Sequence, residues 1–488
     1  MPGLNAGLNI GLSGLHASQS AMDVIGHNIA NINTPGFSRQ QVELATAQPQ
    51  SFGQMQYGSG VDVTRIIGVR DKFLDMQITQ SLGSQSGSDA RYKGIQAIAS
   101  AFQEDGSTGL NTQVQQFFSS LQQLAARPED GALRNNLVGM AETMVNAFKS
   151  RYKMLTDQVK ACDNQVGSMV SEVNSLTKQI AKLNDRIATE PTPGSDSDAR
   201  DQRKALADRL GKLVGIQVFE DEKSRMQITL DTGAAVLVSG NLAAVMTANV
   251  DTAHYGGKLR VEVGLEGPDS HPIDVTKGIR GGDLGGNLDL RDNILPGYQA
   301  RMDQLAASLS GQVNLVHRQG YALDGKTTGI DFFKGGPLKN PQPNNEKGLP
   351  AAIGGPPDYT GMVNCLSVNA AVAADPSLIA AALVPGAAGD NKNAIALAQI
   401  ETTTGQFSAG VSSLANSAGT QAEGFKADAA NQENLTGALQ TQRNRTSAVD
   451  LDEEAAQLLS FQRGYQAAAR FINVISQLTD QLVNGLGK

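Results

Sequence analysis

Apolar or small residues recur every three or four positions from Val138 to Ile187, without interruption. This repeat is typical of a helix that buries one face along its whole length against other helices. At 1.5 Å per residue such a helix would be roughly 75 Å long. We therefore expect a mainly α fold with a long helical bundle. The stripe comprises Val138, Ala141, Val145, Phe148, Tyr152, Leu155, Val159, Cys162, Val166, Met169, Val173, Leu176, Ile180, Leu183 and Ile187.

The N-terminal segment has the same spacing and almost no charge. Between Met1 and Ser38 the only charged side chain is Asp23. A surface helix normally carries charges on its outer face, so we expect more than one face of this helix to contact protein. Such a helix is poorly stable alone, and we expect it to order only on assembly. Its ladder is Leu4, Leu8, Gly11, Leu15, Ser18, Met22, Ile25, Ile29 and Ile32.

A turn is expected where this helix ends, in the sequence "NIANINTPGFSRQ". Pro35 cannot continue a helix and pushes Thr34 toward an extended conformation. Gly36 can adopt a positive φ at the turn. We therefore assign Thr34, Pro35 and Gly36 as the helix-terminating turn, followed to about Arg70 by short, strand-like segments.

The last helix is expected to begin near "VDLDEEAA", with acidic residues in its first turn. Since both ends of the chain are seam-type helices, we expect them to pair as a coiled coil at 1–36 and 449–488. Its apolar face is Leu451, Ala455, Leu458, Phe461, Tyr465, Ala468, Ile472, Ile475, Leu478 and Leu482.

The period changes to two between Val214 and about Leu290, in "GIQVFED", "RMQITLD", "AAVLVSG" and "KLRVEVGL". These segments predict short antiparallel strands, and so a small β domain inserted at 214–283. A short helix is expected before it at 205–213, and another after Pro296. The remainder, 37–213 and 284–448, is expected to form a discontinuous, mainly helical core with irregular segments such as "NPQPNNEKGLP".

Composition excludes several classes of protein. The net charge of −8 argues against a nucleic-acid binder. No apolar run is long enough to cross a bilayer, and no cleaved secretory signal is evident. Two cysteines are too few for a disulfide framework or a cysteine-based zinc site. With no Trp and 5% aromatic residues, we expect aliphatic, small-residue cores.

Motifs that could carry chemistry each have a simpler interpretation. "GYALDGKT", Gly320 to Thr327, matches the phosphate-loop pattern but lacks a preceding strand and a following helix, so we favour a turn. "GGDLGG" is interpreted as a turn and not a dinucleotide site. "LDEE" carries three adjacent carboxylates that suit a helix start better than glycoside cleavage. The five histidines are scattered, and Cys162 lies on an apolar seam. We expect no catalytic residues, metal or cofactor.

Several longer stretches resemble a known family. "GLSGLHASQSAMDVIGHNIANINTPGFSRQQVEL" resembles the N-terminal signature of the bacterial flagellar axial proteins, which are rod, hook and hook-associated proteins. "VDLDEEAAQLLSFQRGYQAAARFINVISQLTDQLV" is similar to the C-terminus of the hook-associated protein 1 family. "DLGGNLDLRDNILPGYQARMDQLAASLSGQVNLVHRQGYALDG", with "GIDFF" after it, resembles that family's central region, and "NAAVAADPSLIAAA" with "GDNKNAIALA" resembles the next segment. The β domain carries no assignable motif.

The resemblance implies a structural protein of the hook–filament junction, whose terminal helices form a ring of subunits around the export channel. It implies secretion through the flagellar type III pathway to an extracellular position. Expected partners are other copies of the chain, the hook protein, a second junction protein and an export chaperone on the C-terminal helix, with neither nucleic acid nor membrane. The expected assembly interface comprises Leu8, Leu15, Met22, Ile25, Ile29, Ile32, Leu451, Leu458, Phe461, Tyr465, Ile472, Ile475, Leu478 and Leu482.

Two alternatives remain open. A hook or distal rod protein would share the "NTPGF" region. A nucleotide-using enzyme would depend on "GYALDGKT" alone.

Overall fold

The computed structural model describes residues 2–52, 55–103, 106, 108–190, 196–267, 271–335 and 358–486. Helices dominate, and antiparallel strands gather mainly between residues 216 and 274, so the expected mainly α fold with an inserted β region is confirmed. The chain divides into two compact units. Unit 1 comprises Met1–Gly87, Ser168–Leu284 and Ala430–Lys488, and unit 2 comprises Ser88–Gly167 and Gly285–Ala429. The expected three-part division stays a prediction, and the "NPQPNNEKGLP" segment lies outside the described residues.

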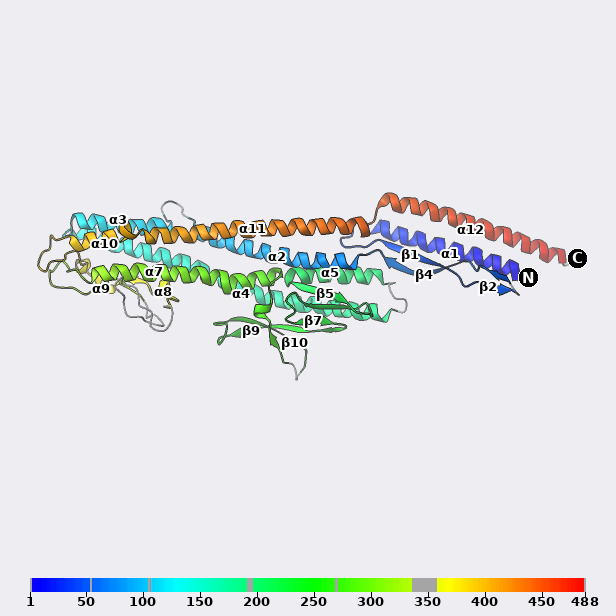
Figure 1. The fold of residues 1–488 in the computed structure, drawn as a ribbon, viewed down its shortest axis with the longest axis horizontal. Coiled ribbons are helices and arrows are strands. Elements are labelled where there is room, and N and C mark those ends of the chain that lie inside the picture. The colour runs from blue at the N-terminus through cyan, green and yellow to red at the C-terminus, as the bar shows by residue number, and fades with distance from the viewer. Residues whose placement is uncertain are drawn as a thin grey trace. The chain divides into compact units, whose positions relative to one another are not determined.

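Unit 1 contains both terminal helices. Helix α1 (Pro2–Ala30) and helix α12 (Leu451–Leu486) run side by side (Figure 1). The chain then forms β1 (Gln40–Thr46), β2 (Gln50–Phe52), β3 (Met55–Tyr57) and β4 (Val61–Gly68). Strands β1 and β4 pair antiparallel and also pack on α1. α1 therefore has protein on two faces, which accounts for its lack of charge.

The long helix is confirmed as α4 (Gly131–Thr189), and it follows α2 (Lys72–Ala101) and α3 (Leu110–Ala126). Helix α5 (Ser197–Leu213) begins eight residues before the expected helix start at Ala205. The reason is its N-cap, because the Asp196 carboxylate accepts the amide of Ala199 at 3.3 Å.

Two small sheets make up the inserted β region between residues 216 and 274. One has the order β5 (Ile216–Glu220), β6 (Met226–Leu230), β7 (Val236–Ser239), β8 (Leu242–Ala243). The other places β10 (Lys258–Gly264) between β9 (Val245–Asp251) and β11 (Ile273–Asp274).

Asparagines of α4 hold both sheets. The Asn184 side chain pairs with the backbone N–H and C=O of Met226, at 2.8 and 2.7 Å, and the Asn174 side chain pairs in the same way with Met246. A planar amide offers one donor and one acceptor, as a neighbouring strand would. α4 therefore completes the hydrogen bonding of strands β6 and β9.

Unit 2 has a core centred on phenylalanines, so the expectation of purely aliphatic cores was wrong. Phe117 contacts Phe118, Phe332 and Phe333, with ring centroids 5.1 to 6.0 Å apart, and Phe118 stacks on Phe407. The aromatic residues are few, but the fold gathers them at one place. Around them pack α7 (Leu295–His317), α8 (Met362–Cys365), α9 (Ala370–Ala374) and α10 (Lys392–Thr404), and β12 (Phe333–Lys334) pairs with β13 (Ser367–Val368).

The strands end earlier than expected, and "GGDLGG" is not a turn as a whole. Gly282 has φ +71°, and α6 (Gly282–Asp289) starts there with Leu284 and Leu288 buried. A π-helical turn (Leu290–Ile294) then joins α6 to α7. The helix therefore begins before Pro296. The wide π turn accommodates this proline, which has no N–H and crowds the carbonyl four residues back.

Candidate assembly interface

The terminal helices are antiparallel and meet through glycines. A Cβ on Gly11 would lie 2.6 Å from Ile472 Cγ1, and one on Gly7 would lie 3.2 Å from Ile475 Cδ1. Farther along, a Cβ on Gly464 would lie 3.3 Å from the Ser18 hydroxyl oxygen. Since glycines occur on both helices at these close approaches, the backbones come nearer than larger side chains would permit.

The expected interface residues fall into a group that is at least partly covered and a group that is exposed. Ile25 is buried, and most of the others are half-buried. Three on α12 remain exposed, namely Leu451, Leu478 and Leu482 at 50%, 48% and 38%. The half-buried group is Leu8, Leu15, Met22, Ile29, Ile32, Leu458, Phe461, Tyr465, Ile472 and Ile475.

A stripe of apolar residues on α12 is uncovered. Phe471, Val474, Leu478 and Leu482 follow helical spacing and are all exposed. Between Leu451 and Leu482 Glu454 is the one buried residue. Contiguous exposed apolar residues are typical of a surface that contacts another protein. The apolar spacing predicts Leu478 and Leu482 on the same seam as Ile472, but it does not separate the covered from the uncovered face of α12.

A buried polar network joins the two helices where α12 begins. The Asn28 amide donates to Glu454 Oε2 at 3.1 Å and to the Gln40 carbonyl at 2.9 Å, and Asn28 Oδ1 accepts the Gln40 N–H at 2.9 Å. Asn28 and Glu454 are 0% and 1% exposed. One asparagine thus fixes the position of α1 against both β1 and α12.

The "GFSRQ" segment is held by charged side chains from three elements. Arg443 of α11 (Gln406–Ser447) donates to the Gly36 carbonyl at 2.9 Å and to the Ser38 hydroxyl at 3.1 Å. Asp201 of α5 accepts the Ser38 N–H and O–H, each at 2.9 Å. Arg39 pairs with Glu453 at 2.6 Å. No local pattern in the sequence predicts these partners, because they are far apart along the chain.

Helix α1 ends at Ala30, four residues before the turn at Thr34, Pro35 and Gly36. The Asn31 backbone N–H and side-chain amide both donate to the His27 carbonyl, at 3.1 and 3.0 Å, but the next amide, that of Ile32, bonds the Ile29 carbonyl three positions back, and the α-helical pattern ends there. The Phe37 amide then bonds the Thr34 carbonyl at 3.2 Å, and Gly36 has φ +84° as expected. The break therefore consists of two consecutive turns.

The phosphate-like loop lacks the surroundings that phosphate binding needs. It follows helix α7, and no helix follows it directly. Its Lys326 and Thr327 amides donate to the Asp324 carboxylate, at 2.9 and 2.8 Å. The Thr327 hydroxyl, followed by these two amides, lowers the pKa of Asp324 to about 2. The loop amides thus already serve an internal anion.

Other candidate groups do not come together. His317 is buried, and burial lowers its pKa. Burial also raises the pKa of Cys162, as befits a buried thiol. Across the described ranges, no cluster of three or more His, Cys, Asp or Glu side chains is arranged to hold a metal. None of the helices searched within those ranges combines the length and apolar character of a membrane span.

Three family models match the chain. Residues 95–333 match the flagellar hook-associated protein FlgK helical domain, residues 8–37 the flagella basal body rod protein, and residues 440–485 the flagellar basal body rod FlgEFG protein C-terminal model. The last two cover the paired ends of the chain.

Curated relatives are all described as flagellar hook-associated protein 1. The Salmonella typhimurium protein is 31% identical over 69% of this chain, but the alignment spans only 61% of that relative. The Escherichia coli protein is 28% identical, over 98% of this chain and 99% of the relative. The Bacillus subtilis protein is 26% identical, over 99% and 98%.

Among solved structures, the fold is similar to the flagellar hook junction protein FlgK from Burkholderia pseudomallei. The TM-score is 0.64 at 16% identity, covering 75% of this chain and 99% of that chain. Paired terminal helices, family matches at both ends and in the middle, and relatives aligned over nearly the full length agree. The chain belongs to the flagellar hook-associated protein 1 family of structural proteins of the flagellum.

Proposed function

We propose that this chain is a subunit of the hook–filament junction, where copies assemble as a ring through their terminal helices and connect hook to filament. The observation that carries the proposal is the exposed apolar stripe on α12, formed by Phe471, Val474, Leu478 and Leu482. α1 packs on the adjacent face of α12, where Ile472 and Ile475 approach Gly11 and Gly7, and it leaves the stripe largely exposed, with room for a neighbouring copy.

The partners follow from this position. One edge of the ring would contact the flagellar hook protein, and the other a second junction protein. Before assembly the stripe would be exposed to water, so an export chaperone would cover α12 in the cytoplasm. The chain would then leave through the flagellar type III pathway and act outside the cell.

The first experiment is electron microscopy of a strain that lacks this gene. Complete hooks without filaments, together with flagellin in the medium, are expected. Missing or broken hooks would favour the alternative, a hook or distal rod protein. Normal flagella would contradict the whole proposal.

Complementation then tests the stripe. Leu478→Asp is expected to block filament growth while leaving the midpoint of thermal unfolding of the purified chain unchanged, since Leu478 is exposed. Gln477→Asp is the matched control, because it adds the same charge at the neighbouring exposed position. Ile472→Asp should also block growth, but through lost pairing with Gly11. Filaments in the Leu478→Asp strain would rule out the stripe as the interface.

A further inference from the structure

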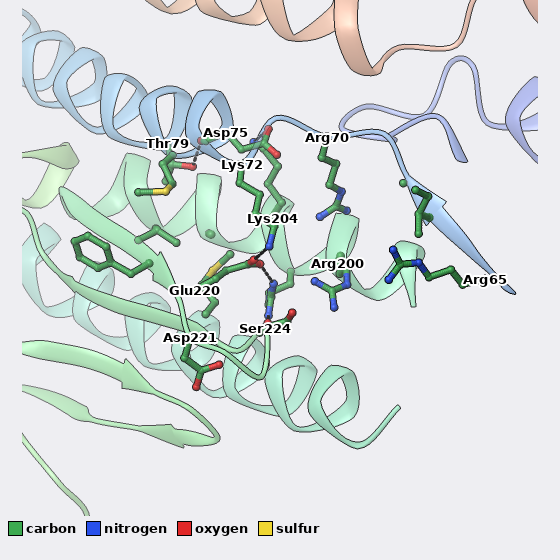
Figure 2. Close-up of a pocket in the computed structure, with 18 residues that line it drawn as sticks. Arg65, Arg70, Lys72, Asp75, Thr79, Arg200, Lys204, Glu220, Asp221 and Ser224 are labelled. Atoms are coloured by element: carbon green, nitrogen blue, oxygen red, sulfur yellow. Dashed lines mark hydrogen bonds and ion pairs between the residues drawn. The ribbon is translucent and has the colours of Figure 1, made fainter. Parts of the chain in front are cut away.

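A basic cavity of about 640 Å³ lies within unit 1, apart from the terminal helices. Its walls come from β4 and the start of α2, from α5, and from β5 and β6 with their connection (Figure 2). Part of the wall is apolar, with Ile67, Met76, Val218 and Phe219.

Cations outnumber carboxylates among the residues that line this cavity, and three of the cations, Arg65, Arg70 and Lys204, pair with carboxylates outside the lining. The described residues that line it include six cations but only three carboxylates, which are Asp75, Glu220 and Asp221. The cations are Arg65, Arg70, Lys72, Arg200, Arg203 and Lys204.

The carboxylates do not neutralise all of these cations. Glu220 is shared between Lys72 at 2.6 Å and Arg203 at 2.5 Å. Arg70 pairs with Asp201, outside the cavity lining. The side chain of Arg200 makes no hydrogen bond or ion pair with any residue that the structure describes.

Three guanidinium groups also keep a buried N–H without an acceptor. These are the Nε–H groups of Arg70, Arg200 and Arg203. Arg70, which precedes α2, and Arg200 of α5 line the cavity from separate elements (Figure 2). Burial lowers the pKa of Arg200, and the charge of Arg70 lowers it further. Burial lowers the pKa of Arg203 to about 10, and the charges of Arg200 and Arg70 also lower it.

We propose that this cavity binds an oxyanion, either a phosphate or a carboxylate group, with Arg200 as its main ligand beside Arg70 and Arg203. A guanidinium presents planar N–H donors that match the oxygens of these groups. A bound anion satisfies the buried N–H groups and relieves the repulsion among the three arginines. The apolar wall accepts the body of an organic anion. The proposal does not depend on the junction role.

Two sources can supply this chemistry: a free phosphate or phosphate ester, or an acidic side chain of another chain in the assembled flagellum. Isothermal titration calorimetry of the full-length chain separates them, with inorganic phosphate and glutarate as probes. Sodium chloride holds ionic strength constant, because salt alone screens such contacts. Binding of phosphate selects the first source, and binding of glutarate alone selects the second.

The decisive variant is Arg200→Gln, which should weaken binding roughly tenfold to a hundredfold. Arg209→Gln is the matched control on the same helix, since Arg209 is exposed and pairs with Glu172 outside the cavity. Its affinity should equal that of the unsubstituted chain. Binding of neither probe, or equal weakening in both variants, would overturn the proposal.

Thermal unfolding gives a second test, because replacing an arginine that only stabilises the fold would lower the midpoint of unfolding. Without anion, Arg200→Gln should raise the midpoint of unfolding, because it removes an unpaired, partly buried charge. It should also abolish the rise that the bound probe produces in the unsubstituted chain. A lower midpoint for Arg200→Gln without anion would contradict the proposal.

Discussion

Asn28 and Glu454 are hydrogen-bonded at 3.1 Å across 426 positions of sequence, and both side chains are buried. The same asparagine pairs with both backbone groups of Gln40. Asn28→Ala should therefore lower the free energy of unfolding of this part of unit 1 by about 3 kcal/mol, because buried partners lose their hydrogen bonds. Amide exchange at Gln40 measures this directly, since its N–H donates to Asn28.

Asn31→Ala is the control for this variant. Asn31 is half-exposed, and its side-chain amide donates to the His27 carbonyl. Its loss should cost only about 1 kcal/mol. Equal exchange rates at Gln40 in the two variants would mean that Asn28 does not anchor α1.

The close approach at Gly11 gives a second prediction. In an exposed helix, Gly→Ala normally stabilises by about 1 kcal/mol, and Gly26→Ala should do so, because no atom lies within 4 Å of the added Cβ. Gly11→Ala should instead destabilise by about 1–3 kcal/mol, since its Cβ would lie 2.6 Å from Ile472 Cγ1. Thermal unfolding followed by circular dichroism compares the two.

The combination Gly11→Ala with Ile472→Ala separates crowding from other causes. The second substitution removes the atom that the new Cβ would meet. The double variant should therefore lose less stability than the sum of the losses in the two single variants. Full additivity would mean that the helices do not meet at Gly11.

The sequence predicts the fold best where a repeat is local and strong. The three-four spacing from Val138 to Ile187 lies wholly inside α4. It did not single out the 42-residue α11, whose buried positions toward its middle are alanines such as Ala418, Ala422 and Ala429. Alanine differs little in hydrophobicity from the polar residues around it, so a helix that buries alanines has a weak amphipathic pattern and is hard to predict.

The polar contacts of the interface could not be read from the sequence. Among the residues that the structure describes, Asn28 is one of four asparagines on helices that pair with both backbone groups of a strand residue, the others being Asn174, Asn184 and Asn314. Nothing in a helical pattern separates such a residue from one that faces solvent. The partner becomes visible only once the fold brings the strand to the helix.

A gradient of order along α1 is the third prediction. The buried residues of α1 lie mostly in its second half, at Ala17, Ser18, Ala21, Val24, Ile25 and Asn28. In the isolated chain, amide exchange should therefore be fast near Leu4 and slow near Asn28, and along α12 it should quicken away from Glu454. Assembly should slow exchange throughout both helices. Slow exchange near Asn28 would mean that the second half of α1 is already ordered in the isolated chain, which limits the expected ordering on assembly to the first half. Uniformly slow exchange along α1 would contradict that expectation altogether.

Asp324 gives a prediction about pH. Its pKa is lowered to about 2 by the Thr327 hydroxyl, and by the amides of Thr327 and Lys326. Because the pKa of an unfolded aspartate is about 3.9, the ionised carboxylate stabilises the folded loop above about pH 4. This stabilisation is lost as pH falls toward 2. Thr327→Val should raise the pKa of Asp324 toward its ordinary value, as measured by NMR titration of the side-chain carboxyl carbon.

Thr328→Val is the matched control, since the Thr328 hydroxyl donates to the Arg318 carbonyl and not to Asp324. In this variant the titration of Asp324 should follow that of the unsubstituted chain.

The same hydrogen bonds bear on the phosphate-loop match. The Lys326 and Thr327 amides, which a nucleotide phosphate would need, already donate to the Asp324 carboxylate. ATP titration should therefore show no saturable binding. Binding that disappears in Lys326→Ala would instead mean that the loop can release Asp324 and accept a phosphate, and the interpretation of this loop as a simple turn would be wrong.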